Sequence, residues 1–422
     1  MTPDLPNKPK ADGKLIATQK KEKFRKKQQK KLLDDKKAKD QTGWLQKHSK
    51  FTIEIDEGDA KIIIDLASCR KGDTRTRNIE QHSKKRQRIE VKPDESKREE
   101  LLNERLSYIQ PFINLKDSSG DPSSRKECNE GQISIDGHRY FIAEGTETVR
   151  MLLEQSSSKD RSNNGLLPIT IHSILTKPSP FFEDPVNLRG TISNFFAEYF
   201  EEKEDATSTN SLPFQIIVAS EKAMSKVVGF NVARGAMACG IVPHYDEIWL
   251  KGFLKKKYDD GKSNIRILAL DNVCDTANLG SLIRTSAAFG INAIILSEDS
   301  CDVFYRRCVR VSMGHALTVP SVRVRDLSST LKSLRESFEV VSYAAVIDKD
   351  ADMVLEETKR GQIAQNWCCV LGNEGNGLTK GLALSCDHRL RIDMSEEVDS
   401  LSVGIAAGIL MHGMQEREQK IN

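Results

Sequence analysis

The chain has 422 residues, of which 38% are hydrophobic and 30% are charged, and its formal net charge is +3. That length has room for two or three domains of about 150 residues each, and no run approaches the roughly 20 apolar residues of a membrane-spanning helix. The nine cysteines form no C-x-x-C pair and the eight histidines show no zinc-ligand spacing, so we expect no structural metal and a reducing compartment. The first residues lack the apolar stretch of a signal peptide, and Asp4 and Asp12 disfavour a mitochondrial transit peptide. The compartment stays open, with the nucleus, nucleolus or cytoplasm favoured over another organelle.

Residues 1–125 are predicted to be a basic, mostly disordered region. Lys20–Lys39 and Lys84–Arg88 are dense in Lys and Arg, and such blocks attract phosphate backbones by releasing counterions. A solvated tail that only aids solubility is the alternative interpretation. The second block also resembles a nuclear import signal.

Two short elements are expected within this region. Phe51–Ile55 alternates between apolar and polar residues, and a turn followed by a return over 60–66 would complete a hairpin. Residues 97–115 are predicted to form a helix that stops near Pro111, because proline lacks a backbone donor. The polar stretch 116–124 is predicted to be a linker.

A small α/β region is expected over residues 131–254. Apolar strand patterns alternate there with helical patterns and polar loops. The predicted strands are Arg139–Ala143, Ile169–Leu175 and Phe214–Ala219, the predicted helices are Thr146–Glu154 and Asn187–Phe200, and the predicted surface loops are Ser156–Gly165 and Glu201–Ser211.

Residues 264–418 are predicted to form an α/β domain whose parallel sheet is covered on both faces. Near-continuous apolar strands that alternate with helices are typical of such sheets. The predicted strands are Asn264–Leu270, Ala293–Leu296, Ser321–Val324, Val340–Ala344 and Cys368–Leu371, and the predicted helices are Leu279–Phe289 and Thr330–Phe338. Ligands bind at the carboxyl ends of the strands in these folds, so the loops there form the candidate site.

The first candidate loop is Asp271–Thr285. Asn278 is expected to cap the following helix through its side-chain oxygen, and Gly280 would allow a close approach of backbone or ligand. Arg284 follows Asn278 by about one and two-thirds helical turns, so both side chains can face the same end of the sheet. A capped helix with a surface arginine is the alternative.

The second candidate loop is Val370–Leu378, which holds three glycines around Glu374. The loop lacks the lysine of the G-x-x-x-x-G-K-[ST] pattern, so it is not a phosphate-binding loop of that kind. The absence of this lysine argues against an ATPase. A carboxylate among glycines suits a cationic ligand or an arginine partner. A simple tight turn is the alternative.

The third candidate loop is Arg391–Val403, which precedes the small-residue helix Gly404–Leu410. Ser400 and Ser402 can cap that helix. Taken singly, the segment also fits a buried helix in a core. Its apolar wall consists of Ile392, Met394 and Leu401.

Taken in order, the three loops resemble the SpoU (TrmH-like) branch of the SPOUT RNA methyltransferases over about residues 264–415. Tyr305–Gly314 resembles the segment between the motifs, and 141–145, 229–230 and 234–238 resemble the small ribosomal-protein-like substrate-binding domain that often precedes the catalytic domain. The matching motif residues are Asn278, Gly280, Arg284 and Thr285 in the first loop, Gly372, Glu374, Gly377 and Leu378 in the second, and Ile392, Met394, Ser400, Leu401 and Val403 in the third.

The resemblance implies an α/β trefoil-knot domain, a homodimer with active sites near the subunit interface, and methyl transfer from S-adenosylmethionine to a ribose 2′-hydroxyl of structured RNA (rRNA or tRNA). It implies catalytic roles for Arg284, Asn278, Glu374 and Ser402, and cofactor contacts from Gly372, Asn373, Ile392, Met394 and Leu401. No metal is implied.

One position departs from the family pattern. The family usually reads Ser-Leu-Asn in the third motif, whereas this chain reads Ser400-Leu401-Ser402, which keeps a hydroxyl but loses a carboxamide. A catalytically silent RNA-binding scaffold of the same fold is therefore the second hypothesis. A nucleotide-binding oxidoreductase is disfavoured, because the dinucleotide glycine fingerprint is missing near the first strand.

Overall fold

The computed structural model describes residues 52–55, 107–113, 115, 133–135, 138–157, 159–178, 188–201, 214–232, 235–261, 264–395 and 397–418. The chain divides into two compact units, Met1–Thr52 and Ile53–Asn422, and both predicted folded domains fall within the second. Their boundary near residues 254–264 stays a prediction. Both basic blocks, the return of the hairpin and most of the 201–211 loop lie outside the described residues.

The first sheet is mixed and has the strand order β1-β5-β4-β6-β3-β2. Strand β4 is parallel to β5, whereas β6 is antiparallel to both β3 and β4. Its strands are β1 (Thr52–Ile55), β2 (Ile133–Ile135), β3 (His138–Glu144), β4 (Ile171–Thr176), β5 (Gln215–Ala219) and β6 (Ala236–Ile241). The helices of this part are η3 (Gln110–Phe112), α6 (Thr146–Ser157), α7 (Lys159–Asn163), α9 (Leu188–Glu201) and α10 (Glu221–Val228).

Most elements expected in this part are confirmed, including β3, β4, β5, α6 and α9. The described end of the helix predicted over 97–115 tightens into the 3-10 helix η3, with Pro111 in its first turn, and Phe112 is buried in the core.

The prediction of a surface loop over Ser156–Gly165 is wrong, because α6 continues to Ser157 and α7 follows it. The reason is Arg161, which is only 4% exposed. Its guanidinium donates to the carbonyls of Leu167 and Leu317 at 2.5 Å each, and to the Tyr245 hydroxyl at 3.0 Å. A polar side chain thus anchors this helix through buried hydrogen bonds.

The second sheet has the order β11-β13-β10-β12-β7-β8-β9, and each of its described strand pairs is parallel. Its strands are β7 (Arg266–Leu270), β8 (Ala293–Ser297), β9 (Ser321–Val324), β10 (Val341–Ala345), β11 (Met353–Val354), β12 (Trp367–Leu371) and β13 (His388–Arg391). The helices are α11 (Glu247–Asp260), α12 (Thr276–Ala288), α13 (Arg306–Val311), η5 (His315–Leu317), α14 (Leu327–Phe338), η6 (Leu355–Glu357), α15 (Lys380–Ser385) and α16 (Val403–Arg417).

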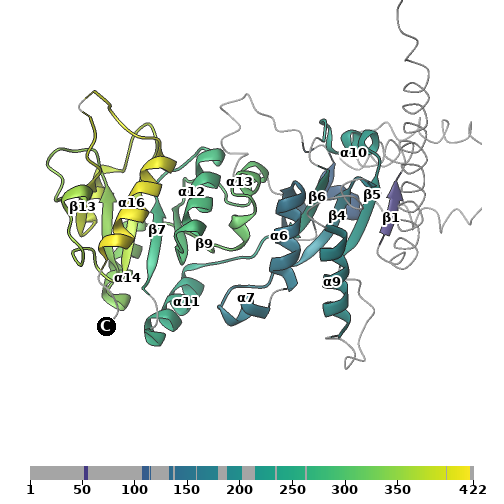
Figure 1. The fold of residues 1–422 in the computed structure, drawn as a ribbon, viewed down its shortest axis with the longest axis horizontal. Coiled ribbons are helices and arrows are strands. Elements are labelled where there is room, and N and C mark those ends of the chain that lie inside the picture. The colour runs from purple at the N-terminus through teal and green to yellow at the C-terminus, as the bar shows by residue number, and fades with distance from the viewer. Residues whose placement is uncertain are drawn as a thin grey trace, which may run out of the picture. The chain divides into compact units, whose positions relative to one another are not determined.

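Helices cover both faces of this sheet, as the strand pattern predicts. On one face, α11, α14 and α15 form a core with alternate strand residues such as Ile267 and Ala269. Helices α12 and α16 lie side by side, and α16 contacts β12 (Figure 1). The polar strand β13 was missed, since its four residues include only one buried side chain, Leu390.

Polar and aromatic contacts join the first sheet to the second. The Glu144 carboxylate at the end of β3 is only 8% exposed and accepts from Arg310 at 3.0 Å and Arg306 at 3.3 Å. The Arg306 guanidinium also lies 4.7 Å from the centre of the Phe230 ring. Charges buried in this way are tolerated because each has a partner of opposite sign.

Candidate functional site

The three candidate loops leave the same edge of the second sheet. Because β7, β10, β12 and β13 are all parallel to their neighbours, their carboxyl ends meet at one edge. Direct contacts join the first two loops there. The Asp271 amide donates to the Leu371 carbonyl at 2.9 Å, and the Asp271 carboxylate accepts from the Thr379 amide at 3.0 Å.

The cap expected from Asn278 is wrong. Helix α12 begins earlier, at Thr276, and Asp275 caps it by accepting from the amides of Ala277 and Asn278 at 2.8 Å each. An aspartate at this position satisfies two amides that the helix itself leaves unpaired. The Asn278 side chain is therefore available for another contact, and its Nδ2 donates to Glu374 Oε1 at 2.6 Å.

The glycine loop after β12 is a tight turn held by Asn373. The Asn373 backbone exchanges hydrogen bonds with Gly377 at 3.1 and 2.8 Å, and its Oδ1 accepts from the amides of Gly375 and Asn376. Gly372 has no room for a side chain, since a Cβ there would lie 2.2 Å from the Gly377 carbonyl carbon. Glu374 lies exposed at the tip.

Arg284 projects from α12 as an exposed side chain. Within the described part of the chain it forms no hydrogen bond or ion pair. Arg284 therefore does not bond to Asn278 or to Glu374, although the sequence is compatible with either contact. Its charge does act on His315 of η5, which contacts α12. Burial and then the Arg284 charge lower the pKa of His315 below its ordinary value.

Small residues set the close packing around α12. A Cβ on Gly280 would lie 2.8 Å from the Cys308 carbonyl oxygen of α13. On the other side, Gly404 of α16 faces Ser281, whose hydroxyl lies 3.1 Å from where a Cβ would be, and Gly408 faces Thr285. The helix that carries Asn278 and Arg284 is thus fixed from two directions.

The third loop contributes the apolar wall that the sequence predicts. The side chains of Ile392, Met394 and Leu401 are half-buried. Next to Ile392, the Asp393 amide donates to Glu356 at 2.9 Å, which ties the loop to η6. Ser402 is the N-cap residue of α16, but its hydroxyl makes no capping hydrogen bond, and Ser400 is not the cap.

Several residues that shape the site were missed in the sequence. Asp275 stands at a detectable capping position, directly before the helix and three residues before Asn278. The side chains of Arg323 and Glu356 bind backbone groups far away in the sequence, and the backbone carbonyl of Asn272 accepts from the Asn373 side chain. No local pattern identifies such contacts. Among the described residues, no group of His, Cys, Asp or Glu is arranged to hold a metal ion, and no helix there is long and apolar enough to cross a membrane.

Comparison with known proteins places this geometry in context. The SpoU rRNA Methylase family matches residues 266–412. The 23S rRNA (guanosine-2'-O-)-methyltransferase RlmB of Acinetobacter baylyi is 31% identical over 204 residues, which cover 47% of this chain and 78% of that protein. RlmB of Coxiella burnetii is 32% identical over 182 residues, which cover 43% of this chain and 68% of that protein.

Other relatives are matched over a smaller share of their length. An uncharacterized tRNA/rRNA methyltransferase of Mycobacterium tuberculosis is 33% identical over 196 residues, and the chain spans 64% of its length. Among solved structures, the SpoU methyltransferase AviRb of Streptomyces viridochromogenes, in complex with the cofactor AdoMet, has a TM-score of 0.48 at 16% identity and covers 74% of this chain and 96% of its own.

Proposed function

The chain belongs to the SpoU rRNA Methylase family, and from that premise we propose that it transfers a methyl group from S-adenosylmethionine to a ribose 2′-hydroxyl of structured RNA. The observation that carries the proposal is the hydrogen bond from Asn278 to Glu374. It joins two of the three family motifs at the sheet edge where ligands of parallel α/β folds bind.

The residues at this edge fit the proposed cofactor. S-adenosylmethionine would supply a methyl group activated by a sulfonium. The half-buried side chains of Ile392, Met394 and Leu401 offer an apolar surface that suits the adenine ring of this cofactor. The turn requires glycine at position 372, because no Cβ fits there. The exposed Glu374 carboxylate offers a negative charge that suits a cationic sulfonium.

Arg284 is suited to hold the RNA and to stabilise charge on the attacking oxygen. A guanidinium stays protonated in proteins, so it is a poor general base. Its planar donors can grip a phosphate and stabilise the developing alkoxide, while the proton passes to phosphate or water. Holding the hydroxyl in line with the methyl group can supply roughly 7–11 kcal/mol of the barrier reduction at best.

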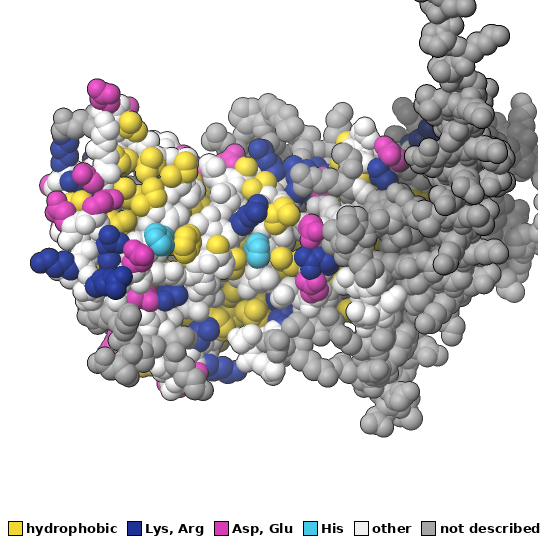
Figure 2. Space-filling view, in the orientation of Figure 1, with side chains coloured by type: hydrophobic (Ala, Val, Ile, Leu, Met, Phe, Trp, Pro, Cys, Tyr) yellow, Lys and Arg dark blue, Asp and Glu magenta, His cyan; other side chains and the backbone are white. Residues whose placement is uncertain are grey.

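We further propose that RNA, either rRNA or tRNA, is the partner and that two copies of the chain form a homodimer. Helix α16 exposes Ile405 and Ile409, which are 57% and 38% exposed and lie one helical turn apart. Figure 2 shows hydrophobic side chains on the face that carries α16. Because α16 packs on α12, a second copy bound there would lie beside the helix that bears Arg284.

A catalytically silent RNA-binding scaffold is the second candidate. Ser402 favours it, because it stands where the family usually has asparagine and its hydroxyl makes no capping bond. Retention of Asn278, Arg284 and Glu374 favours the enzyme, since a scaffold does not need all three.

Two measurements test the proposed reaction, and a third tests the proposed RNA contact. Calorimetric titration of the full chain with S-adenosylmethionine should show binding, and no binding at millimolar cofactor would support the scaffold instead. Mapping of ribose methylation in RNA from cells with and without the protein should reveal a lost 2′-O-methyl group and identify the nucleotide. Deleting residues 1–50 should flatten the salt dependence of RNA affinity if the basic block contacts phosphates.

A further inference from the structure

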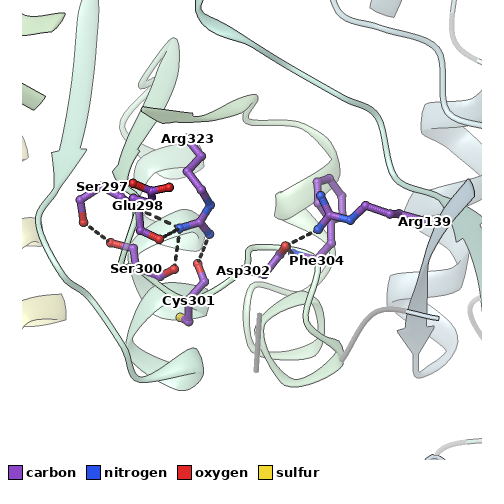
Figure 3. Close-up of polar contacts among 8 residues, drawn as sticks. All are labelled: Arg139, Ser297, Glu298, Ser300, Cys301, Asp302, Phe304 and Arg323. Carbon is purple, nitrogen blue, oxygen red and sulfur yellow. Dashed lines mark hydrogen bonds and ion pairs between the residues drawn. The ribbon is translucent and has the colours of Figure 1, made fainter. Parts of the chain in front are cut away.

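One arginine of the second sheet is bonded to an entire turn. Arg323 on β9 directs its guanidinium into the turn that follows β8 (Figure 3). Its Nη1 donates to the carbonyls of Ser297 at 2.9 Å, Glu298 at 2.8 Å and Ser300 at 2.7 Å, and its Nη2 donates to the carbonyl of Cys301 at 3.1 Å. Only a guanidinium offers enough fixed donors for four carbonyls at once. The 297–301 turn is therefore wrapped around a single side chain.

The hydroxyls of this turn support the first candidate loop. Ser297 Oγ accepts from the Asn272 amide at 2.8 Å, and Ser300 Oγ accepts from the Val273 amide at 3.2 Å. The Cys301 amide in turn donates to the Val273 carbonyl at 2.9 Å. The residue after the turn, Asp302, accepts from Arg139 of the first sheet at 2.5 Å (Figure 3).

The hydrogen bonds continue from Asn272 into the glycine loop. Asn272 has a φ of 54°, in the left-handed region that asparagine tolerates better than most residues. Its carbonyl accepts from Asn373 Nδ2 at 2.9 Å. Asn373 Oδ1 holds the amides of Gly375 and Asn376, so the loop conformation depends on where Asn272 lies.

We propose that Arg323 is a positioning residue for cofactor binding, which fixes the Gly372–Gly377 loop through the 297–301 turn and Asn272. The inference rests on the proposed methyltransferase function. Removing the guanidinium takes one donor from each of the four carbonyls, although the Ser297 carbonyl still accepts from the Ser300 amide at 3.2 Å. The turn then loses its single conformation and Asn272 loses its support. Helix α12 does not depend on this path, because Asp275 caps it and α13 and α16 pack against it.

The test compares Arg323→Gln and Arg323→Lys with Arg325→Gln, an exposed arginine next but one in the sequence. The readouts are the Kd for S-adenosylmethionine by calorimetry, its KM, and kcat at saturating cofactor. Arg323→Gln should raise Kd and KM by about tenfold, since the displaced loop is that of the cofactor. Arg323→Lys should restore part of the affinity with its three donors, and Arg325→Gln should match the wild type.

A merely structural role gives a different pattern. Loss of folded protein lowers the apparent kcat and leaves KM and Kd unchanged, and that result overturns the inference. If Arg323→Gln does not fold, Arg323→Lys and Ser297→Ala must still raise Kd, and unchanged values overturn it equally. A wild-type chain that binds no S-adenosylmethionine removes the proposed function and the inference together, whereas binding that is equal in wild type and variants removes the inference alone.

Discussion

The Asn278 side-chain amide donates a 2.6 Å hydrogen bond to the Glu374 carboxylate and so joins the first turn of α12 to the glycine loop after β12. A hydrogen bond to a charged acceptor is stronger than one between neutral groups. The pair fixes the direction of the carboxylate relative to the helix that carries Arg284. Asn278 and Glu374 should therefore act as one unit.

A double-mutant cycle tests this coupling. Asn278→Ala and Glu374→Ala should each lower kcat/KM. The double variant should be only slightly less active than the less active of the two single variants, because either change breaks the same contact. Steady-state methylation of RNA by the four proteins gives the coupling. Losses that simply multiply in the double variant would mean that the two side chains act independently.

Arg284 should matter for activity and hardly at all for stability. It is exposed and has no hydrogen bond or ion pair within the described residues. Arg284→Ala should leave the thermal midpoint unchanged and lower kcat by roughly 100-fold or more, the usual loss for a donor that stabilises developing charge. Arg284→Lys should recover little, since an ammonium lacks the planar fork. Near-full activity of the lysine variant would refute the need for a planar donor, and Arg325→Ala serves as the control for losing a surface charge.

Sequence patterns predicted five of the seven strands of the second sheet, because those five are near-continuous apolar runs. The expected β8, β9 and β12 agree with the structure within a residue at each end. Strand β13 escaped because His388 and its neighbours are polar, and α7 escaped because its buried group is a guanidinium rather than an apolar side chain. Periodicity detects burial of apolar residues, and these two elements bury or pair polar ones. The short strand β11 and the strand β6 were missed as well.

The candidate site was predictable in its parts but not in its connections. The motif loops were found, whereas Asn278 was assigned as a helix cap although Asp275 takes that position. Contacts such as Arg323 to the Ser300 carbonyl join residues from different strands. Nothing in the local sequence near either residue encodes that partner.

Gly372 should be irreplaceable for steric reasons. A Cβ there would meet the Gly377 backbone at 2.2 Å, and backbone, unlike a side-chain tip, cannot move aside without reshaping the turn. Gly372→Ala should abolish measurable S-adenosylmethionine binding while costing about 1–3 kcal/mol of unfolding free energy. The matched control is Gly381→Ala in α15, where an added Cβ meets nothing within 4 Å, and calorimetry with denaturant unfolding checks both. Retained binding by Gly372→Ala would show that the loop conformation is not required.

Two sets of ion pairs join β3 to the 302–310 segment. We expect the more buried set to contribute more to the free energy of unfolding. Glu144 is only 8% exposed between Arg306 and Arg310, so Glu144→Ala leaves buried charges unpaired and should cost about 2–4 kcal/mol in urea unfolding. The pair of Arg139 with Asp302 includes a side chain that is 51% exposed, and Arg139→Ala should cost only about 0–1 kcal/mol. Equal losses in the two variants would mean that burial does not set the energy of these contacts.

His315 should give the protein a pH-dependent stability. Burial and then the Arg284 charge lower its pKa in the folded state below the ordinary value of 6.5. As pH falls through that value, the unfolded chain takes up a proton before the folded chain does, so this residue makes the fold less stable in acid. The contribution is present above the ordinary pKa and is lost as pH falls. Unfolding followed from pH 8 to pH 5 should show a smaller loss in His315→Gln, which cannot titrate.

The two causes can be separated by removing only the arginine. In Arg284→Ala the pKa of His315 should rise. It can be followed by NMR of the imidazole C–H protons, and the resonance is assigned because it is missing in His315→Gln. The pKa should still stay below 6.5, because burial is the larger cause. A full return to the ordinary value would show that Arg284 alone sets the pKa, and no change would show that the guanidinium points away from η5 in solution. A partial rise would place the charge of Arg284 beside the imidazole, where an RNA phosphate that binds Arg284 would raise the same pKa.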